Sequence, residues 1–181
     1  MLTYAWDFDS DGDYDDAFGE NPIFSASDKN GPSVVTVGLK ITDQAGHSDT
    51  ATADVSIENV APTPDAGPNQ TVYRNDVVYL EGSWMDPAGN LDDPYGWTWD
   101  LDADGIEDSW GSALYGEAIP ASTSFALEGF YTLTFTVTDN DEGFGSDTIT
   151  IEVLNQAPVC TEAMPSVELL WPANHKFVAI E

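Results

Sequence analysis

Hydrophobic and polar residues alternate along several stretches of the chain, and this alternation predicts strands. Every second residue is apolar from 35 to 41 and again from 131 to 137, with mostly threonine, lysine or glycine between. Successive side chains of a strand point to opposite faces, so one face of each strand would be buried. Glycine and proline interrupt the chain before any segment reaches the length of an ordinary helix. We therefore expect an all-β fold in which short strands pack their apolar faces together as a sandwich.

The sequence also repeats itself. "YAWDFDSDGD" at 4–13 matches "WTWDLDADGI" at 97–106, "VVTVGLKITD" matches "YTLTFTVTD", and "SDTATADVSIENVAP" matches "SDTITIEVLNQAP". The offset is 93 residues from Tyr4 to Trp97 and 96 residues from Asp43 to Asp139. An immunoglobulin-like sandwich has about 100 residues, so each repeat has the size of one such unit. The expected fold is a tandem array of immunoglobulin-like antiparallel β-sandwich modules.

The repeat divides the chain into three parts. Residues 1–62 match only the later part of the second unit, so this first unit is expected to lack its opening strands. Residues 63–158 form a complete unit, and residues 159–181 would be the opening strands of a further module or a terminal extension. The joints "NVAP" at 59–62 and "NQAP" at 155–158 are too short to act as free linkers. The modules should therefore stand nearly end to end.

These segments resemble the PKD domain family, named after polycystic kidney disease protein. The resemblance rests on "YAWDFDSDGD" with "VGLKITDQAG", and on "GSWMDP", "WTWDLDADG" and "EGFYTLTFTVTDNDEG". It covers residues 4–62 in part and 63–158 in full, and it implies a non-catalytic β-sandwich of extracellular or cell-surface proteins. In the commonest family pattern a short turn follows the Trp-Asp strand, whereas both copies here carry an acid-rich loop.

The chain is strongly acidic. Its 33 Asp and Glu face only 4 Lys and Arg, which gives a formal net charge of -29. Such a field repels phosphate backbones and anionic lipid surfaces, so nucleic acid is not an expected partner and cations are. No apolar run approaches the roughly 18 residues of a membrane-spanning helix, so membrane insertion is not expected.

Cysteine usage and the first residues bear on the compartment. Cys160 is the single cysteine, which excludes an internal disulfide. An extracellular or cell-surface protein of bacteria or archaea fits this composition, although cysteine count alone leaves the cytosol open. "MLTYAWDF" has neither the basic nor the apolar region of a signal peptide. If the protein is exported, we expect this sequence to be a piece of a longer precursor.

The two acid-rich loops share the spacing D-x-D-x-D-G-x-x-D and are the candidate chemistry of the chain. Calcium takes six to eight oxygen ligands at about 2.3 to 2.6 Å, and this spacing lets a tight loop aim several carboxylates at one point. The seventh position would contribute a backbone carbonyl, as in known calcium loops. The predicted ligands are Asp7, Asp9, Asp11, Asp13 and Asp15 in one loop, and Asp100, Asp102, Asp104, Ile106 and Asp108 in the other.

These loops differ from an EF-hand, because Phe18 and Gly111 stand where the bidentate glutamate would be and no helices flank them. The alternative is that Asp and Gly simply form turns between strands. Occurrence of the same spacing at equivalent repeat positions favours a cation, since crowded carboxylates repel one another until a cation binds. Magnesium fits less well because it prefers fewer protein ligands and stricter geometry.

Two further groups of acids could join a second ion site, but we interpret them as hairpin turns. They are Asp139, Asn140, Asp141 and Glu142, and Asp86, Asp92 and Asp93.

The tryptophans offer a different clue. Trp6 and Trp99 are expected to be core residues, as tryptophan is on the equivalent strand of immunoglobulin domains. A row of exposed rings would instead indicate carbohydrate binding, with candidates Trp84, Trp97, Trp110 and Tyr115, and Trp171 unassigned.

The favoured function is a calcium-rigidified structural or adhesion array, with protein or polysaccharide at a cell surface as its partner. The alternative is a carbohydrate-binding accessory module of a secreted polysaccharide-degrading enzyme. No nucleophile, base and orienting group recur together, so we expect no enzymatic activity. The incomplete first unit would expose strand edges, and a neighbouring chain could cover them by head-to-tail self-association.

Overall fold

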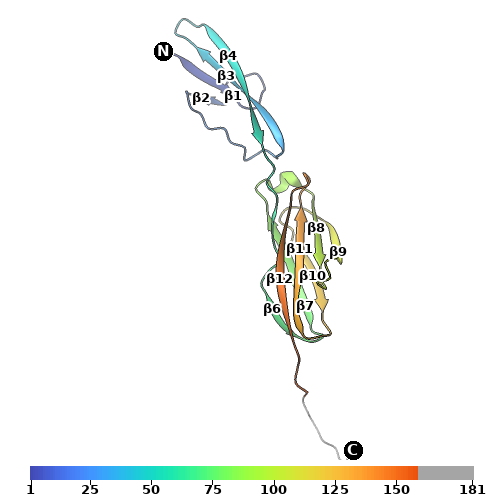
Figure 1. Cartoon of the computed structure of the whole chain (residues 1–181). Helices are drawn as coiled ribbons and strands as arrows, with labels where there is room; N and C mark the ends of the chain where they lie inside the picture. Colours follow the sequence, from blue (N-terminus) through green and yellow to red (C-terminus); the bar gives the residue numbers. More distant parts are fainter. Residues whose placement is uncertain (159–181) are drawn as a thin grey trace, which may run out of the picture.

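A computed structural model describes residues 1–158 of the chain, and the predicted opening strands at 159–181 lie outside this range. The described residues form two β units that stand end to end, joined by a short extended segment between β4 and β5 (Figure 1). Among residues 1–158 the one helical element is a single 3-10 turn, η1 (Gly89–Asp92). No helix in the described range is long and apolar enough to cross a membrane.

The first unit is a single antiparallel sheet in the order β2-β1-β3-β4. Its strands are β1 (Thr3–Asp7), β2 (Ala17–Phe18), β3 (Ser33–Thr42) and β4 (Ser48–Ile57). The long β3–β4 hairpin pairs Ser33 with Ile57 at one end and Thr42 with Ser48 at the other. β1 lies beside β3, with Asp7 opposite Gly38 where β1 ends and the first acidic loop begins.

The second unit is a sandwich of a three-stranded sheet, β10-β7-β5, and a five-stranded sheet, β6-β12-β11-β8-β9. The strands are β5 (Thr63–Asp65), β6 (Gln70–Tyr73), β7 (Val77–Met85), β8 (Tyr95–Asp100), β9 (Ser109–Ala113), β10 (Ile119–Ser124), β11 (Gly129–Thr138) and β12 (Phe144–Leu154). The prediction of an all-β, immunoglobulin-like fold is confirmed. Within its largely antiparallel pairing, β6 and β12 form one parallel pair.

The core of the second unit lies between these two sheets. Trp99 and Phe135 are fully buried and stack with ring centroids 4.6 Å apart. Alternate residues of β11, including Leu133 and Val137, point into the same core. Gly82 of the facing sheet lies so close that a Cβ there would come within 2.7 Å of the Phe135 ring. The alternation in the sequence thus identified the buried face of β11 correctly.

The same positions in the first unit are not covered by a second sheet among the described residues. Val37 is buried, but Ile41 is only half-buried, whereas its counterpart Val137 is fully buried. Ala53 of β4 is exposed although Ile149, its counterpart, is buried. One face of this sheet therefore remains open to solvent over much of its length.

Because only the second unit has a covering sheet in the described range, the two predicted core tryptophans differ in burial. Trp99 is buried in the sandwich as expected, but the prediction is wrong for Trp6, which is half-buried. The Trp6 indole instead donates from Nε1 to the carbonyl of Gly19 over 2.9 Å and lies 6.1 Å from the ring of Phe8. Trp6 therefore anchors the loop that follows β1.

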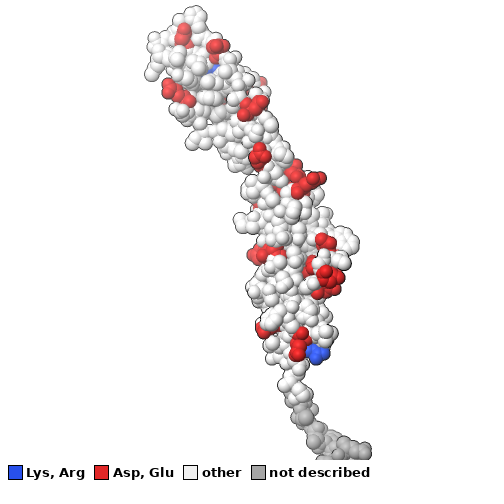
Figure 2. All heavy atoms as spheres, viewed as in Figure 1, with Lys and Arg blue, Asp and Glu red and all other residues white. Residues whose placement is uncertain are grey.

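Acidic side chains are spread along the whole visible length of both units, with very few basic ones between them (Figure 2). The described residues contain just two ion pairs, Lys29 with Asp28 and His47 with Asp43. The acidic clusters of this range therefore receive little compensation from basic side chains.

Candidate metal centres

The first acidic loop wraps around the carboxylate of Asp7, the last residue of β1. Asp7 is buried, and its Oδ1 accepts a hydrogen bond from Ser10 N at 2.6 Å while its Oδ2 accepts one from Gly12 N at 3.1 Å. Ser10 and Gly12 adopt positive φ values of 61° and 92°. These two left-handed residues turn the backbone N–H groups inward, which is costly for a serine and is compensated by the bonds to Asp7.

The second loop repeats this construction around Asp100, the last residue of β8. Asp100 accepts from Ala103 N through Oδ1 at 2.8 Å and from Gly105 N through Oδ2 at 3.0 Å. Ala103 and Gly105 have φ values of 66° and 84°. The two loops thus share their backbone conformation as well as their sequence spacing.

The next two acids of each loop also hold equivalent positions. Asp9 Oδ1 accepts from Asp11 N at 3.1 Å, and Asp102 Oδ1 accepts from Asp104 N at 3.1 Å. Asp11 and Asp104 each accept from the residue two positions later, at 2.8 Å in both loops. Each of these carboxylates uses one oxygen to support the loop, so its other oxygen is available to a ligand.

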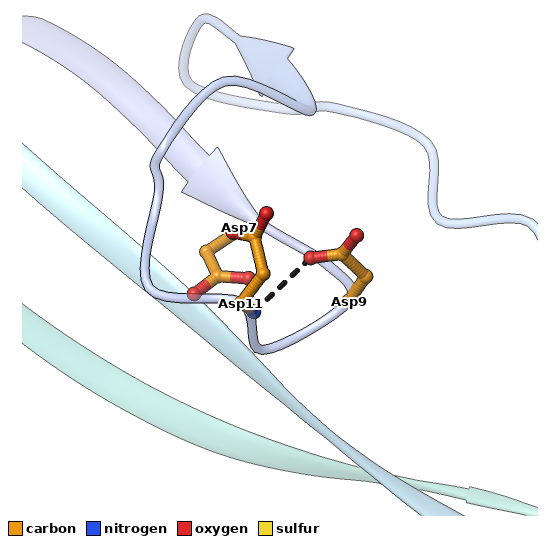
Figure 3. Close-up of side chains that lie close together, drawn as sticks. All are labelled: Asp7, Asp9 and Asp11. Atoms are coloured by element: carbon orange, nitrogen blue, oxygen red, sulfur yellow. Dashed lines mark hydrogen bonds between the residues drawn. The ribbon is translucent and has the colours of Figure 1, made fainter.

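The carboxylates converge in both loops. One oxygen from each of Asp7, Asp9 and Asp11 lies within 4.8 Å of the others, and the three side chains lie close together on the loop (Figure 3). In the second loop the converging residues are Asp100, Asp102 and Asp108. A single cation with oxygen ligands at about 2.3 to 2.6 Å can contact carboxylates at such spacing after small rotations.

Not every predicted ligand joins these groups. Asp13, Asp15 and Asp104 lie outside the converging sets, and the proposed use of the carbonyl oxygens of Asp13 and Ile106 stays a prediction.

Asp16, not Asp15, is the structural counterpart of Asp108. Asp16 Oδ2 accepts from Phe8 N at 2.6 Å, and its own N donates to Trp6 O at 3.1 Å. Asp108 makes the same two bonds, accepting from Leu101 N at 2.7 Å and donating to Trp99 O at 2.8 Å. The linear spacing selected Asp15, which is a misalignment, because the first loop contains one more residue before the chain returns to Trp6.

Electrostatic repulsion is visible in the second loop. Partial desolvation raises the pKa of Asp102, and the charges of Asp104, Asp108 and Asp100 add to this effect, against a hydrogen bond from Asp104 N. A bound cation would offset the repulsive part of this effect, because its charge is opposite to that of the carboxylates.

A third cluster unites acids from two groups that the sequence allowed as ion ligands but favoured as turn residues. Asp86, Asp92 and Asp139, which we interpreted as turn residues, come together in the second unit with one oxygen each within 4.8 Å of the others, and all three are buried. They follow or end three different elements, β7, η1 and β11. Local spacing could not reveal the cluster, and the one available signal was the presence of acids at the same end of several predicted strands.

The candidate sugar-binding aromatics do not form a row on the surface. Trp84 is buried, with its ring 5.3 Å from that of Tyr95, and Trp97 is half-buried in the core. Of the four candidates, only Trp110 and Tyr115 are exposed, at 73% and 39%. Trp171 lies outside the described residues.

Comparison with known proteins adds little beyond the fold. No protein-family model matches the chain. Among solved structures it is similar to the three N-terminal domains of the bacteriophage RB49 highly immunogenic outer capsid protein (Hoc), with a TM-score of 0.42 and 12% sequence identity. The match covers 84% of this chain and 48% of that one, so the chain spans about half of the structure it resembles.

Proposed function

We propose that this chain is a calcium-binding structural or adhesion segment of an extracellular or cell-surface protein, built from PKD-like units. The observation that supports the proposal best is the duplicated acidic loop. Two loops of one unusual backbone conformation place Asp7 and Asp100 at equivalent positions, each with further carboxylates converging beside it. Turn formation alone requires neither the matching conformation nor the gathering of like charges.

The loop geometry suits reversible binding of a hard cation. Backbone N–H groups already hold Asp7 and Asp100 in place, so little ordering would accompany ion binding. Calcium accepts an irregular set of oxygen ligands and therefore tolerates differences such as the extra residue of the first loop. Dissociation constants of about 0.1 to 1 mM are expected, as in other extracellular calcium modules.

Calcium would stiffen each unit by linking the end of its Trp-containing strand to the loop that follows. In the second unit that strand is β8, an interior strand of the five-stranded sheet between β11 and β9, so fixing its end fixes the loop relative to the sandwich. We propose that the stiffened array acts without catalysis, as a spacer or as an adhesive element toward protein or polysaccharide at a bacterial or archaeal surface.

Calorimetric titration of the chelator-treated chain with calcium chloride tests this proposal. Wild type should bind calcium in the submillimolar to millimolar range, and the double variant Asp9→Asn with Asp102→Asn should lose both loop sites. Glu128→Gln, which removes an exposed acid outside every cluster, serves as the control for loss of an acidic charge elsewhere and should bind as wild type does. Equal calcium binding by the double variant and the control would refute the assignment of the loops.

A further inference from the structure

The joint between the two units is held by two asparagines. Asn59, in the segment after β4, donates from Nδ2 to Asp139 Oδ2 over 2.9 Å. Asn30, in the segment between β2 and β3, donates from Nδ2 to Asp141 Oδ2 over 3.0 Å. Gly31 lies so close to the joint that a Cβ there would be 2.6 Å from Asn59 N. The first unit therefore contacts the second at its β11–β12 turn.

Three buried carboxylates lie at this end of the second unit. Asp86 is 5% exposed, Asp92 is 0% exposed and Asp139 is 6% exposed. Their nearest oxygens lie within 4.8 Å of one another. Three ionisable acids with so little access to water are rare in a protein core, where charged groups are normally paired.

Several of these oxygens have no hydrogen-bond partner. Neither Oδ1 nor Oδ2 of Asp92 has one, and Asp86 Oδ2 and Asn30 Oδ1 are also buried and unpartnered. Asp139, by contrast, accepts from Asp141 N at 2.9 Å and from Gly143 N at 2.7 Å as well as from Asn59. The cluster thus combines one carboxylate in a fixed position with four acceptor oxygens that are aimed at no donor.

No basic side chain supplies the missing charge. Within residues 1–158, no lysine, arginine or histidine pairs with any of the three carboxylates. Asn30 reaches this region from the first unit, since its Nδ2 donates to the carbonyl oxygen of Leu91, next to Asp92, over 3.4 Å. A cluster of buried, mutually repelling acids needs either protons or a bound cation.

We propose that Asp86, Asp92 and Asp139 bind a divalent cation of the calcium type, that Asn30 Oδ1 completes the site from the first unit, and that the ion thereby locks the joint. The ligands are all oxygens, which selects a hard cation. They come from four separate segments in an irregular arrangement, which calcium tolerates and magnesium, with its strict octahedral geometry and retained waters, does not.

This third site is independent of the two loops, because it shares no residue with them. Its charge at full ionisation exceeds that of a divalent ion, and all three of its carboxylates are buried, whereas Asp7 is the one buried acid of the converging loop sets. Electrostatic attraction increases as the effective dielectric constant falls, so we expect the third site to bind calcium more tightly than either loop.

The first unit provides an internal comparison at Asp43, the repeat counterpart of Asp139. Asp43 Oδ1 accepts from Ala45 N at 2.8 Å and from His47 N at 2.9 Å, which is the same turn as at Asp139. Asp43 is exposed, however, and in the described range no second and third acid converge on it. The turn alone therefore does not create the site, and Asp43→Asn serves as the control for the loss of a ligand at the proposed site.

Ion counting by native mass spectrometry on chelator-treated protein, with added calcium chloride, tests the site. Asp92→Asn should bind one ion fewer than wild type, whereas Asp43→Asn should bind the same number. The double variant Asp9→Asn with Asp102→Asn, called the double loop variant, should retain the ion of the third site. Because Asp92→Asn removes a buried charge, it should fold without calcium. If that variant does not fold, Asn30→Ala replaces it, with an expected loss of calcium affinity at this site of about 10- to 100-fold. An unchanged ion count in Asp92→Asn, or unchanged affinity in Asn30→Ala, would overturn the proposal.

Small-angle X-ray scattering tests the locking of the joint separately. Calcium should narrow the distribution of overall dimensions in wild type and in the double loop variant but not in Asp92→Asn. Failure of the loop assignment would leave this result intact, so the two proposals can be judged apart. A distribution that calcium does not change in wild type would show that the ion does not control the joint.

Discussion

Asn59 contacts Asp139 across the joint, with Nδ2 of the asparagine 2.9 Å from Oδ2 of the carboxylate. The contact links the segment after β4 to the turn between β11 and β12, and it supplies one of the few donors that face the buried acids. Gly143 completes this packing, since a Cβ at that position would lie 2.6 Å from Asn59 Nδ2. The side-chain amide of Asn59 thus holds the first unit against the second and also stabilises the negative charge of Asp139.

Asn59→Ala should therefore destabilise the second unit. Removing the donor leaves Asp139 Oδ2 buried without that partner, and such losses cost about 1 to 3 kcal/mol. We expect a lower melting temperature in chelator, measured by circular dichroism or calorimetry. Asn155, which occupies the matching position in the second "N-x-A-P" segment, is exposed, so Asn155→Ala should have little effect. Equal effects of the two substitutions would contradict this interpretation.

Asp102→Asn should abolish the contribution of the second loop to calcium-dependent stability. At a calcium concentration ten times the dissociation constant, each site adds about 1.4 kcal/mol to the free energy of unfolding. For a unit of this size, that is a shift of several degrees in the melting temperature. The calcium-free melt should change little, because the substitution also removes a source of repulsion. Thermal melts of the variant and of Glu128→Gln, with and without calcium, measure the difference.

Asp16 and Asp15 should differ in their importance for the first loop. Asp16 holds the position of Asp108, which converges with Asp100 and Asp102, whereas Asp15 makes no equivalent bond. In Asp16→Asn the amide oxygen can still accept from Phe8 N, so the loop would keep its conformation and lose one charge. We expect Asp16→Asn to weaken calcium binding at this loop more than Asp15→Asn does, as measured by calorimetry in the Asp102→Asn background. The opposite order would restore the assignment made from spacing.

Gly82→Ala should destabilise the sandwich of the second unit. The added methyl group would lie 2.7 Å from the ring of Phe135, which itself stacks on Trp99. Overpacking of this kind costs about 1 to 3 kcal/mol. Gly96→Ala is the control, because the nearest atom to a Cβ there is 3.8 Å away. A urea melt that moves equally for both variants would show that packing against Phe135 is not the cause.

The sequence predicted the strands well because their pattern is local. Alternation along 131–137 identified the buried face of β11, and the repeat located both acidic loops at the ends of β1 and β8. Most of what the sequence did not predict depends on contacts between distant segments. Trp84 and Trp6 are the same residue type and have the same general preference for burial. Trp84 is buried because it faces a second sheet, whereas Trp6 faces none within residues 1–158 and is half-buried.

For the same reason, the sequence did not predict that the acids of the third cluster converge. Asp86, Asp92 and Asp139 are each followed or preceded by ordinary turn residues, so their local sequence indicates turns, and the structure indeed uses Asp86 and Asp139 in turns. Only the folding of β7 and β11 brings one oxygen each of Asp86 and Asp139 close to one of Asp92. Asp16 was missed because the first loop contains one more residue than the second. The extra residue shifts the sequence alignment of the two loops but leaves the hydrogen bonds that close the loop unchanged.

The parallel pairing of β6 with β12 has a mechanical consequence. The chain enters the second unit at the joint and leaves after β12 at the opposite end, so a pulling force along the array would act along these strands (Figure 1). The ladder from Ile151 and Gln70 to Leu154 and Tyr73 would then be loaded in shear, because its slanted hydrogen bonds cross between two strands that are pulled in opposite directions. Bonds loaded this way must break together rather than one after another. The second unit is thus arranged to resist extension when its two ends are pulled apart.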